Sequence, residues 1–259
     1  MDLGISGKKA IICASSRGLG KGCAIALAEA GCDVVLNGRN EQVLAATADE
    51  IRNATGVRVE QVIADVSTSA GQDALLAACP NPDILVNNNG GPPFRDFRVL
   101  DRAALLEGVT QNMVTPIELI QRVIDGMCER EFGRIVNITS SSVYMPIPGL
   151  DLSSGARAGL TSFLAGVART VADRNVTINF LLPGKMDTDR LTSSFKNTSE
   201  KTGKSIEDVK QATLQQIPAK RAGTISEFGN TCAFLCSRHA GYMTGRSLLV
   251  DGGIYPSAF

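Results

Sequence analysis

Residues 13–20 read Cys-Ala-Ser-Ser-Arg-Gly-Leu-Gly and join a short apolar run to an amphipathic one. The apolar run, 9–13, is typical of a buried strand, and 20–30 has the periodicity of a helix. Gly18 and Gly20 let the backbone approach a ligand closely, and the N–H groups that open a helix attract a pyrophosphate. This stretch predicts a strand–turn–helix unit that binds a dinucleotide, although a purely structural turn could also carry two glycines.

The same alternation of short apolar runs and longer amphipathic runs continues along the chain, with a second helix expected at 41–54. Strands separated by helices favour right-handed crossovers and a parallel sheet that is covered on both faces. Ligands of such sheets bind outside the carboxyl ends of the strands. We therefore expect an α/β fold, a doubly wound parallel sheet of Rossmann type, with residues 1–259 forming a single domain. The expected strands are 9–13, 33–37, 58–63, 84–88, 134–139, 176–182 and 247–250.

The least regular region is 189–216, which is polar and directly follows the expected strand 176–182. A polar segment at a strand end is a candidate for a mobile lid over a substrate. A solvated helical insertion explains the same composition.

Composition excludes several classes of function. Lys and Arg together number 26, as do Asp and Glu, so the net charge of zero gives no reason to expect nucleic acid as a partner. The chain has no tryptophan, which argues against a platform for stacking bases. No run approaches the roughly 18 to 20 apolar residues that span a bilayer, and the first residues do not resemble a secretion signal. We expect a cytoplasmic protein, no membrane contact and a small-molecule partner.

The seven cysteines include no Cys-x-x-Cys pair and fit neither a disulfide framework nor a structural zinc site. Cys232 and Cys236 lie four residues apart on an expected helix, 227–237, and buried packing explains them better than metal binding. His239 is the only histidine and lies far in sequence from the other candidate residues. No metal site is predicted.

The end of the second expected strand, Leu36-Asn37-Gly38-Arg39-Asn40, bears on the choice of cofactor. A carboxylate at this point accepts hydrogen bonds from the adenosine ribose of NAD, whereas cations bind the 2′-phosphate of NADP. Gly38 occupies the acidic position, and Arg39 and Arg17 could both reach a phosphate. The sequence predicts NADP(H), the alternative being that both arginines are solvated surface residues.

Together these motifs resemble the short-chain dehydrogenase/reductase family, and the resemblance covers essentially the whole chain. The family has T-G-x-x-x-G-x-G where this chain has Cys13 and Ala14 in place of the Thr and the first Gly. Alanine fits a tight turn only if its φ is negative, so this replacement predicts a reduced affinity for the cofactor. Asp251-Gly252-Gly253 matches the C-terminal signature of the family.

The resemblance implies a set of residues that bind the cofactor along the carboxyl edge of the sheet. Asp65 and Val66 correspond to the pair that binds adenine, and Asn87-Asn88-Asn89-Gly90 corresponds to the family's N-N-A-G strand end. Pro183, Gly184 and Thr188 match the turn that holds the nicotinamide carboxamide. The full set is Ala14, Ser16, Arg17, Gly18, Leu19, Gly20, Arg39, Asp65, Val66, Asn88, Asn89, Gly90, Arg157, Pro183, Gly184 and Thr188.

The same resemblance implies the catalytic positions. Family members use a Ser after the fifth strand, a Tyr thirteen residues later as general acid and base, and a Lys four residues further on. Ser140 matches the first, but Ser153 stands where Tyr is expected and Arg157 where Lys is expected. An aliphatic hydroxyl is a much weaker acid than a phenol, and a guanidinium does not pass on a proton. Asn112 matches the family's Asn that organises a catalytic water.

Two other residues could stand in for the missing proton donor. Tyr144 lies four residues after Ser140, and the alternative role for it is packing at the rim of the pocket. Lys185 follows Pro183-Gly184 and should lie close to the nicotinamide, although a lysine more often faces solvent.

Two functions are compatible with these residues. The first is an NADP(H)-dependent oxidoreductase, similar to 3-oxoacyl-carrier-protein reductases, that acts on an unidentified carbonyl or alcohol. The second is a catalytically silent relative that binds nucleotide or a protein partner. The resemblance also implies a homo-oligomer, a dimer or tetramer, that packs the helices expected at about 101–130 and 153–173.

Overall fold

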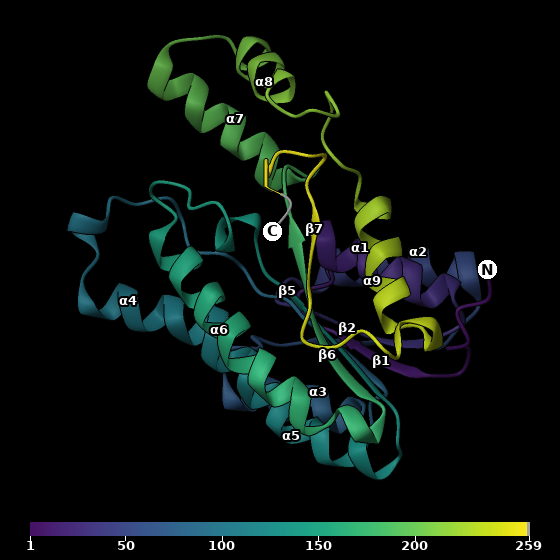
Figure 1. Ribbon diagram of the computed structural model, residues 1–259. Helices are drawn as coiled ribbons and strands as arrows, with labels where there is room; N and C mark the ends of the chain where they lie inside the picture. Colours follow the sequence, from purple (N-terminus) through teal and green to yellow (C-terminus); the bar gives the residue numbers. More distant parts are fainter. Residues whose placement is uncertain (258–259) are drawn as a thin grey trace.

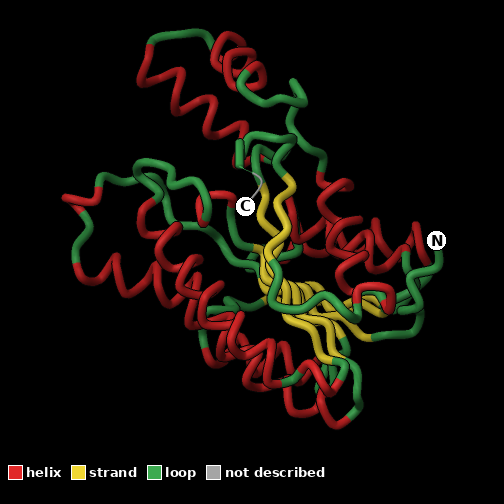
Figure 2. The backbone as a smooth tube through the Cα atoms, viewed as in Figure 1, coloured by secondary structure: helices red, strands yellow, loops and turns green. Residues whose placement is uncertain are grey.

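A computed structural model describes residues 1–257 and contains one sheet of seven parallel strands, in the order β3-β2-β1-β4-β5-β6-β7 (Figures 1 and 2). The strand order reverses between β1 and β4, which is the point where ligands bind to doubly wound sheets. The predicted fold is confirmed, and every predicted strand agrees with an observed one to within one residue at each end. The strands are β1 (Lys9–Ile12), β2 (Asp33–Gly38), β3 (Val59–Ile63), β4 (Ile84–Asn87), β5 (Gly133–Ile138), β6 (Val176–Pro183) and β7 (Ser247–Val250).

Helices cover both faces of this sheet (Figure 1). Neighbouring strand residues point to opposite faces, so Ile12 packs in one core and Ile11 in the other. On the Ile12 face lie α1 (Gly18–Glu29), α2 (Glu41–Thr55) and α9 (Ile225–Cys236). On the Ile11 face lie α3 (Ser69–Ala78), α5 (Thr115–Glu129) and α6 (Asp151–Thr170). The remaining helices are α4 (Arg102–Val109), α7 (Asp189–Thr202) and α8 (Ile206–Gln215).

Two glycines bring α1 and α9 into close contact. A Cβ atom on Gly229 would lie 2.2 Å from the carbonyl oxygen of Gly22, and one on Gly22 would lie 2.3 Å from that of Ile225. No larger side chain fits either position without moving a helix. Because α1 begins at the glycine-rich turn, this packing fixes the direction in which that helix points.

The polar region 189–216 forms α7 and α8, which project beyond the carboxyl ends of the strands (Figure 1). Gly203 ends α7 with a φ of +70°, and the side chain of Ser205 caps α8 by accepting from the N–H of Asp208. The buried apolar contacts of the two helices are few and centre on Leu191, Phe195 and Val209. The sequence showed little regularity here because helices with so small a buried face carry few apolar residues.

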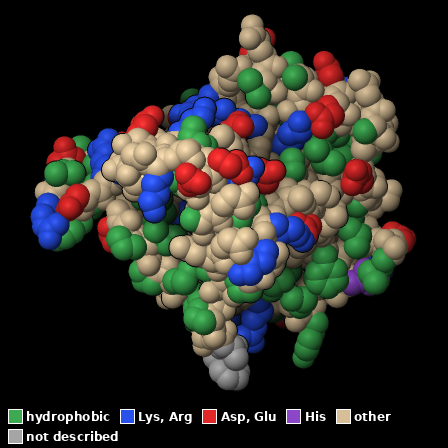
Figure 3. Space-filling model, turned by 90° about the horizontal axis from the view of Figure 1, so that it is seen from above, with side chains coloured by type: hydrophobic (Ala, Val, Ile, Leu, Met, Phe, Trp, Pro, Cys, Tyr) green, Lys and Arg blue, Asp and Glu red, His purple; other side chains and the backbone are tan. Residues whose placement is uncertain are grey.

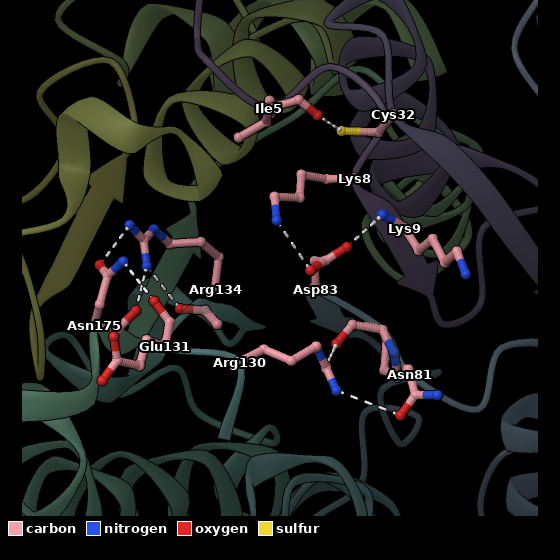
Figure 4. A network of polar contacts seen from close by, with 12 residues as sticks. Ile5, Lys8, Lys9, Cys32, Asn81, Asp83, Arg130, Glu131, Arg134 and Asn175 are labelled. Carbon is pink, nitrogen blue, oxygen red and sulfur yellow. Dashed lines mark hydrogen bonds and ion pairs between the residues drawn. The ribbon is translucent and has the colours of Figure 1, made fainter. Parts of the chain in front are cut away.

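The opposite, amino-terminal edge of the sheet is held by a polar network (Figure 4). Arg134 is 1% exposed and donates to the carbonyl oxygens of Gly133, Asn175 and Ser237 and to the side chain of Asn175. Its guanidinium also lies 4.4 Å from the centre of the Phe132 ring. This buried arginine has a partner on each of its three nitrogens.

Candidate active site

The glycine-rich turn between β1 and α1 depends on glycine at two positions. Gly18 has a φ of +58°, and a Cβ atom on Gly20 would lie 2.4 Å from the carbonyl oxygen of Ala14. The N-cap residue of α1, Arg17, provides no side-chain hydrogen bond, so the first N–H groups of the helix are available to an anion.

The backbone of Ala14 is strained, because its φ of +46° lies in the left-handed region that favours glycine. Left-handed backbone costs a residue with a Cβ atom about 1 kcal/mol or more relative to glycine. Two neighbours hold the strained turn: Asn37 Oδ1 accepts from the N–H of Ala14, and Asn88 Nδ2 donates to its carbonyl oxygen. The condition of a negative φ is therefore not met, and the reduced affinity for the cofactor stays a prediction.

Close packing against the glycine-rich turn accounts for the glycine at position 38, the last residue of β2. A Cβ atom there would lie 3.0 Å from both Cβ and Oγ of Ser16, which leaves little room for any side chain. The neighbouring Arg39 is exposed and lies 3.6 Å from Asp65, whereas Arg17 lies 3.9 Å from Asp189 at the start of α7. Both arginines therefore border the turn and extend into solvent.

Asp65 is held in its ionised form. Its Oδ1 accepts from the N–H and the hydroxyl of Ser67, and these two bonds, with a smaller contribution from Arg39, lower its pKa. The side chains of Val66 and Leu19 instead pack in the two hydrophobic cores. At Val66, which is 3% exposed, only the backbone can face a ligand, whereas Leu19 is partly buried.

The strand end after β4 connects this turn with the centre of the site. Asn88 reaches Ala14, as described above, while Asn89 Nδ2 donates to the carbonyl oxygen of Gln111. The side chain of Asn89 also accepts from the N–H of Gly90. The predicted residues Asn88, Asn89 and Gly90 therefore link the glycine-rich turn to the segment between α4 and α5.

Ser153 and Arg157 are both buried on α6, at 5% and 8% exposure. Arg157 Nε donates to Ser153 Oγ over 3.2 Å, and its Nη1 donates to the carbonyl oxygens of Ile138 and Thr139 over 2.6 Å and 3.1 Å. Burial, with a smaller contribution from the charge of Arg190, lowers the pKa of Arg157 to about 10. The guanidinium still carries its charge at neutral pH.

Ser140 lies one residue beyond Thr139, whose carbonyl oxygen Arg157 binds. Its Oγ accepts from the N–H of Ser142 over 3.1 Å, which leaves the hydroxyl hydrogen for another acceptor. The structure therefore brings Ser140, Ser153 and Arg157 to the same end of the sheet.

Asn112 lies in a single π-helical turn, Thr110–Val114, between α4 and α5. Its Nδ2 donates to the carbonyl oxygen of Gly108, and its buried Oδ1 has no partner among the described residues. A small cavity beside it is also lined by Arg157, Asn87 and Asn137. An acceptor without a partner, at a π-helical turn and next to a buried cation, is typical of a functional site.

Gly184 and Thr188 lie where β6 leads into α7. A Cβ atom on Gly184 would lie 2.6 Å from Cα of Asp251, so this position requires glycine. Thr188 is the N-cap residue of α7, and its methyl group lies near Gly18 of the glycine-rich turn. Pro183 is the last residue of β6.

The two candidate proton donors differ in their surroundings. Tyr144 is 44% exposed and stacks on Tyr255, with 5.4 Å between the ring centres. Lys185 is half-buried, and loss of solvent lowers its pKa. Neither residue is among those that line the cleft, so their predicted roles gain no support from its geometry.

A cleft of about 180 Å³ joins the two halves of the site. Arg39 and Asp65 line it near the glycine-rich turn, and Ser153 lines it near α6. Several of its polar residues carry no recognisable sequence motif and lie on a loop, on α4 and on the π-helical turn. These residues are Arg95, Glu107 and Gln111.

Nothing in the described residues indicates a metal site: no group of three or more His, Cys, Asp or Glu side chains could hold an ion. All seven cysteines are free thiols, and six of them are buried. His239 Nε2 lies 2.7 Å from the carbonyl oxygen of Asp2, remote from the cleft.

Among residues 1–257, no helix has the length and apolar character needed to cross a membrane.

Charged side chains of both signs are interspersed on the face seen in Figure 3. This distribution agrees with the net charge of zero. It gives no reason to expect a polyanionic partner on this face.

Comparison with known proteins identifies the family. Residues 13–255 match the family model described as enoyl-(acyl carrier protein) reductase. A 3-oxoacyl-[acyl-carrier-protein] reductase of Aquifex aeolicus is 31% identical over 98% of this chain and 100% of its own. The NADPH-dependent reductase BacG of Bacillus subtilis is 30% identical over 96% of this chain and 98% of its own.

Solved structures agree with this result. The L-sorbose reductase of Gluconobacter frateurii, complexed with NADPH and L-sorbose, superposes with a TM-score of 0.93 at 29% identity. The match covers 99% of this chain and 100% of that one. This protein is a member of the short-chain dehydrogenase/reductase family.

Proposed function

We propose that this protein is an NADP(H)-dependent oxidoreductase that acts on a carbonyl or alcohol, similar to the 3-oxoacyl reductases. The observation that carries the proposal is the single cleft that has Arg39 and Asp65 along one part and Ser153 along another. A dinucleotide bound at the glycine-rich turn would extend along such a cleft towards α6. The family and the NADPH-dependent relatives support the same reading.

The predicted cofactor residues fit NADP(H) in this arrangement. Arg17 and Arg39 would bind the 2′-phosphate, because both are exposed beside a turn that carries no carboxylate at Gly38. Asp65 and the backbone of Val66 would hold the adenine. The nicotinamide half would contact Asn88–Gly90, Pro183, Gly184, Thr188 and Arg157. When bound, this cofactor supplies or accepts the hydride.

Ser153 and Arg157 are the residues that we predict at the positions of the family's Tyr and Lys. We assign them roles that differ from those of Tyr and Lys. Arg157 remains protonated, so it would stabilise negative charge on the substrate oxygen without releasing a proton. Ser140 would donate a hydrogen bond to the same oxygen, and Asn112 Oδ1 would hold a water in the adjoining cavity. Proton transfer would be slower, since loss of a positioned general acid typically costs about 10² to 10⁴ in rate.

The arrangement of helices suggests two further features of this enzyme. Residues 1–259 would act as one domain, with 189–216 as a mobile substrate lid, because α7 and α8 bury few apolar side chains. Exposed apolar residues on the surface of α4, the π-turn and α6 would pack against a second copy of the chain in a dimer or tetramer. These residues are Leu105, Leu106, Val109, Val114 and Phe163.

A specific observation favours a second candidate, a silent relative that binds nucleotide or a protein partner. Ser153 Oγ already accepts from Arg157 and is buried, so this hydroxyl is a poor substitute for a phenol. The two candidate functions are distinguished by an assay of NADPH oxidation. It is followed at 340 nm with a panel of ketones and 3-oxoacyl thioesters. Turnover that depends on substrate supports the oxidoreductase, whereas NADPH binding with no turnover on any substrate supports the silent relative.

A further inference from the structure

The two cavities of the site contain no side chain that readily releases a proton. Among the described residues that line the main cleft or the small cavity beside Asn112, none is Tyr, His, Cys or Lys. The carboxylates of the cleft act as acceptors, since Asp65 accepts from Ser67 and Glu107 accepts from Gln111. An oxygen atom that gains negative charge here therefore has no general acid among these residues.

The site does contain two donors that can hold such an oxygen. Arg157 is 8% exposed, and its Nη2 has no partner among the described residues and is not enclosed by protein atoms. Ser140 accepts from the N–H of Ser142, and its hydroxyl hydrogen has no acceptor among the described residues. The small cavity at Arg157 shares Asn89 and Gln111 with the main cleft. Both donors can stabilise an oxyanion without neutralising it.

This combination suits one kind of reduction better than another. Hydride transfer to the carbonyl carbon of an isolated ketone leaves an alkoxide, a strong base that needs a proton on its oxygen at once. Hydride transfer to the β-carbon of a C=C bond conjugated with a carbonyl leaves an enolate, whose charge is shared between oxygen and carbon. Because an enolate is the weaker base, fixed hydrogen-bond donors are enough to stabilise it, and the proton is added later, at carbon.

We infer that this protein reduces a C=C bond conjugated with a carbonyl group, and that Arg157 and Ser140 hold the carbonyl oxygen. The β-carbon accepts the hydride that NADPH supplies, the electron pair of the C=C bond shifts to form the enolate, and the α-carbon then takes a proton from water. The products are the saturated carbonyl compound and NADP⁺. The substrate class is an α,β-unsaturated ketone or thioester, and this inference rests on the proposed function.

The compound 2-cyclohexenone tests the inference, because it offers both bonds in one molecule. Reduction of the C=C bond gives cyclohexanone, and reduction of the C=O bond gives 2-cyclohexenol. The full-length protein is incubated with this compound and NADPH deuterated at C4, and gas chromatography with mass spectrometry measures both products and the position of the label. Since carbonyl reduction lacks its general acid, we expect cyclohexanone labelled at C3 in at least about tenfold excess. Alcohol in equal or greater amount overturns the inference.

A pair of thioesters distinguishes failure of the inference from failure of the proposed function. Oxidation of NADPH is followed with crotonyl-coenzyme A, which carries a conjugated C=C bond, and with acetoacetyl-coenzyme A, which carries a ketone. Faster oxidation with the crotonyl thioester supports the inference. Oxidation with the acetoacetyl thioester alone overturns the inference and leaves the oxidoreductase intact. No oxidation with either thioester or with 2-cyclohexenone overturns both.

Binding of 4-nitrophenol gives a readout that does not depend on turnover. Its ionised form resembles an enolate, because the charge lies on an oxygen joined to a conjugated system, and its colour distinguishes it from the neutral phenol. Absorbance is measured over a series of pH values with the full-length protein saturated with NADP⁺. Because hydrogen bonds to a charged group are the stronger ones, we expect the phenolate to bind at least about tenfold more tightly than the phenol. Equal affinity of the two forms overturns the inference.

Variants assign this preference for the phenolate to residues. Arg157→Gln should abolish the preference, and Arg157→Lys should keep part of it. If Arg157→Gln does not fold, Ser140→Ala serves instead, since loss of one hydrogen bond should lower the preference about threefold. Arg169→Gln changes an exposed arginine on the same helix, α6, and is the matched control, which should leave the preference unchanged. A preference that persists in full in the folded Arg157 and Ser140 variants overturns the inference.

Discussion

Ser153 and Arg157 lie one turn apart on α6 and are joined by a hydrogen bond of 3.2 Å from Nε to Oγ. In the same side chain, Nη1 binds the carbonyl oxygens at the end of β5. The two residues that the sequence predicts at the positions of the family's Tyr and Lys are thus a connected pair. This pair fixes a positive charge at the site and supplies no phenol.

Restoring the family's residues should restore proton transfer. The double variant Ser153→Tyr with Arg157→Lys should raise reductase activity on 3-oxoacyl substrates by about 10²-fold or more, because a phenol beside a lysine is an effective general acid. Ser153 lines the cleft of about 180 Å³, which offers space for the larger ring. Steady-state oxidation of NADPH measures the change. An unchanged rate in a folded double variant would show that the substrate pocket itself has diverged.

Ala14→Gly should relieve the strain at the glycine-rich turn. Glycine adopts a φ of +46° without cost, so the free energy of unfolding should rise by about 1 kcal/mol. The dissociation constant of NADPH should fall. Chemical denaturation measures the first effect and fluorescence titration the second. Ala46→Gly, on the exposed face of α2, is the control, and it should destabilise the protein by about 0.5–1 kcal/mol. Destabilisation of similar size by both variants would contradict the account of the turn.

Arg39→Ala should weaken the binding of NADPH but not that of NADH. If Arg39 contacts the 2′-phosphate, the dissociation constant of NADPH should rise about tenfold or more, while that of NADH, which lacks this phosphate, should hardly change. The comparison variant is Arg58→Ala, another exposed arginine, which pairs with Glu60. If Arg39→Ala weakened the binding of both nucleotides equally, the proposed contact between Arg39 and the 2′-phosphate would be wrong.

Asp65 offers a test based on pH. Because Ser67 lowers the pKa of Asp65 in the folded protein, ionised Asp65 favours the fold at neutral pH, and this contribution is lost as the pH falls through the lowered pKa. Ser67→Ala removes one donor, so the pKa should rise towards its usual value and the loss should begin at higher pH. An NMR titration of the carboxyl carbon measures the pKa directly. A pKa that does not move would exclude the Ser67 hydroxyl as its cause.

The sequence predicted the sheet well because every strand is a short apolar run between helices, which local patterning reveals. It could not predict the φ of Ala14, since that angle depends on Asn37 and Asn88, which are distant in the chain. It also could not predict the contact of Arg190 with Gly91 and Pro92, because α7 and the loop after β4 meet only in three dimensions. The roles assigned to the site residues remain predictions.

The most direct test is a fluorescence titration of the purified protein with NADPH and, separately, with NADH. We expect micromolar binding of NADPH and at least about tenfold weaker binding of NADH, since only NADPH carries the phosphate that Arg17 and Arg39 would bind. No detectable binding of either nucleotide would contradict the proposed oxidoreductase.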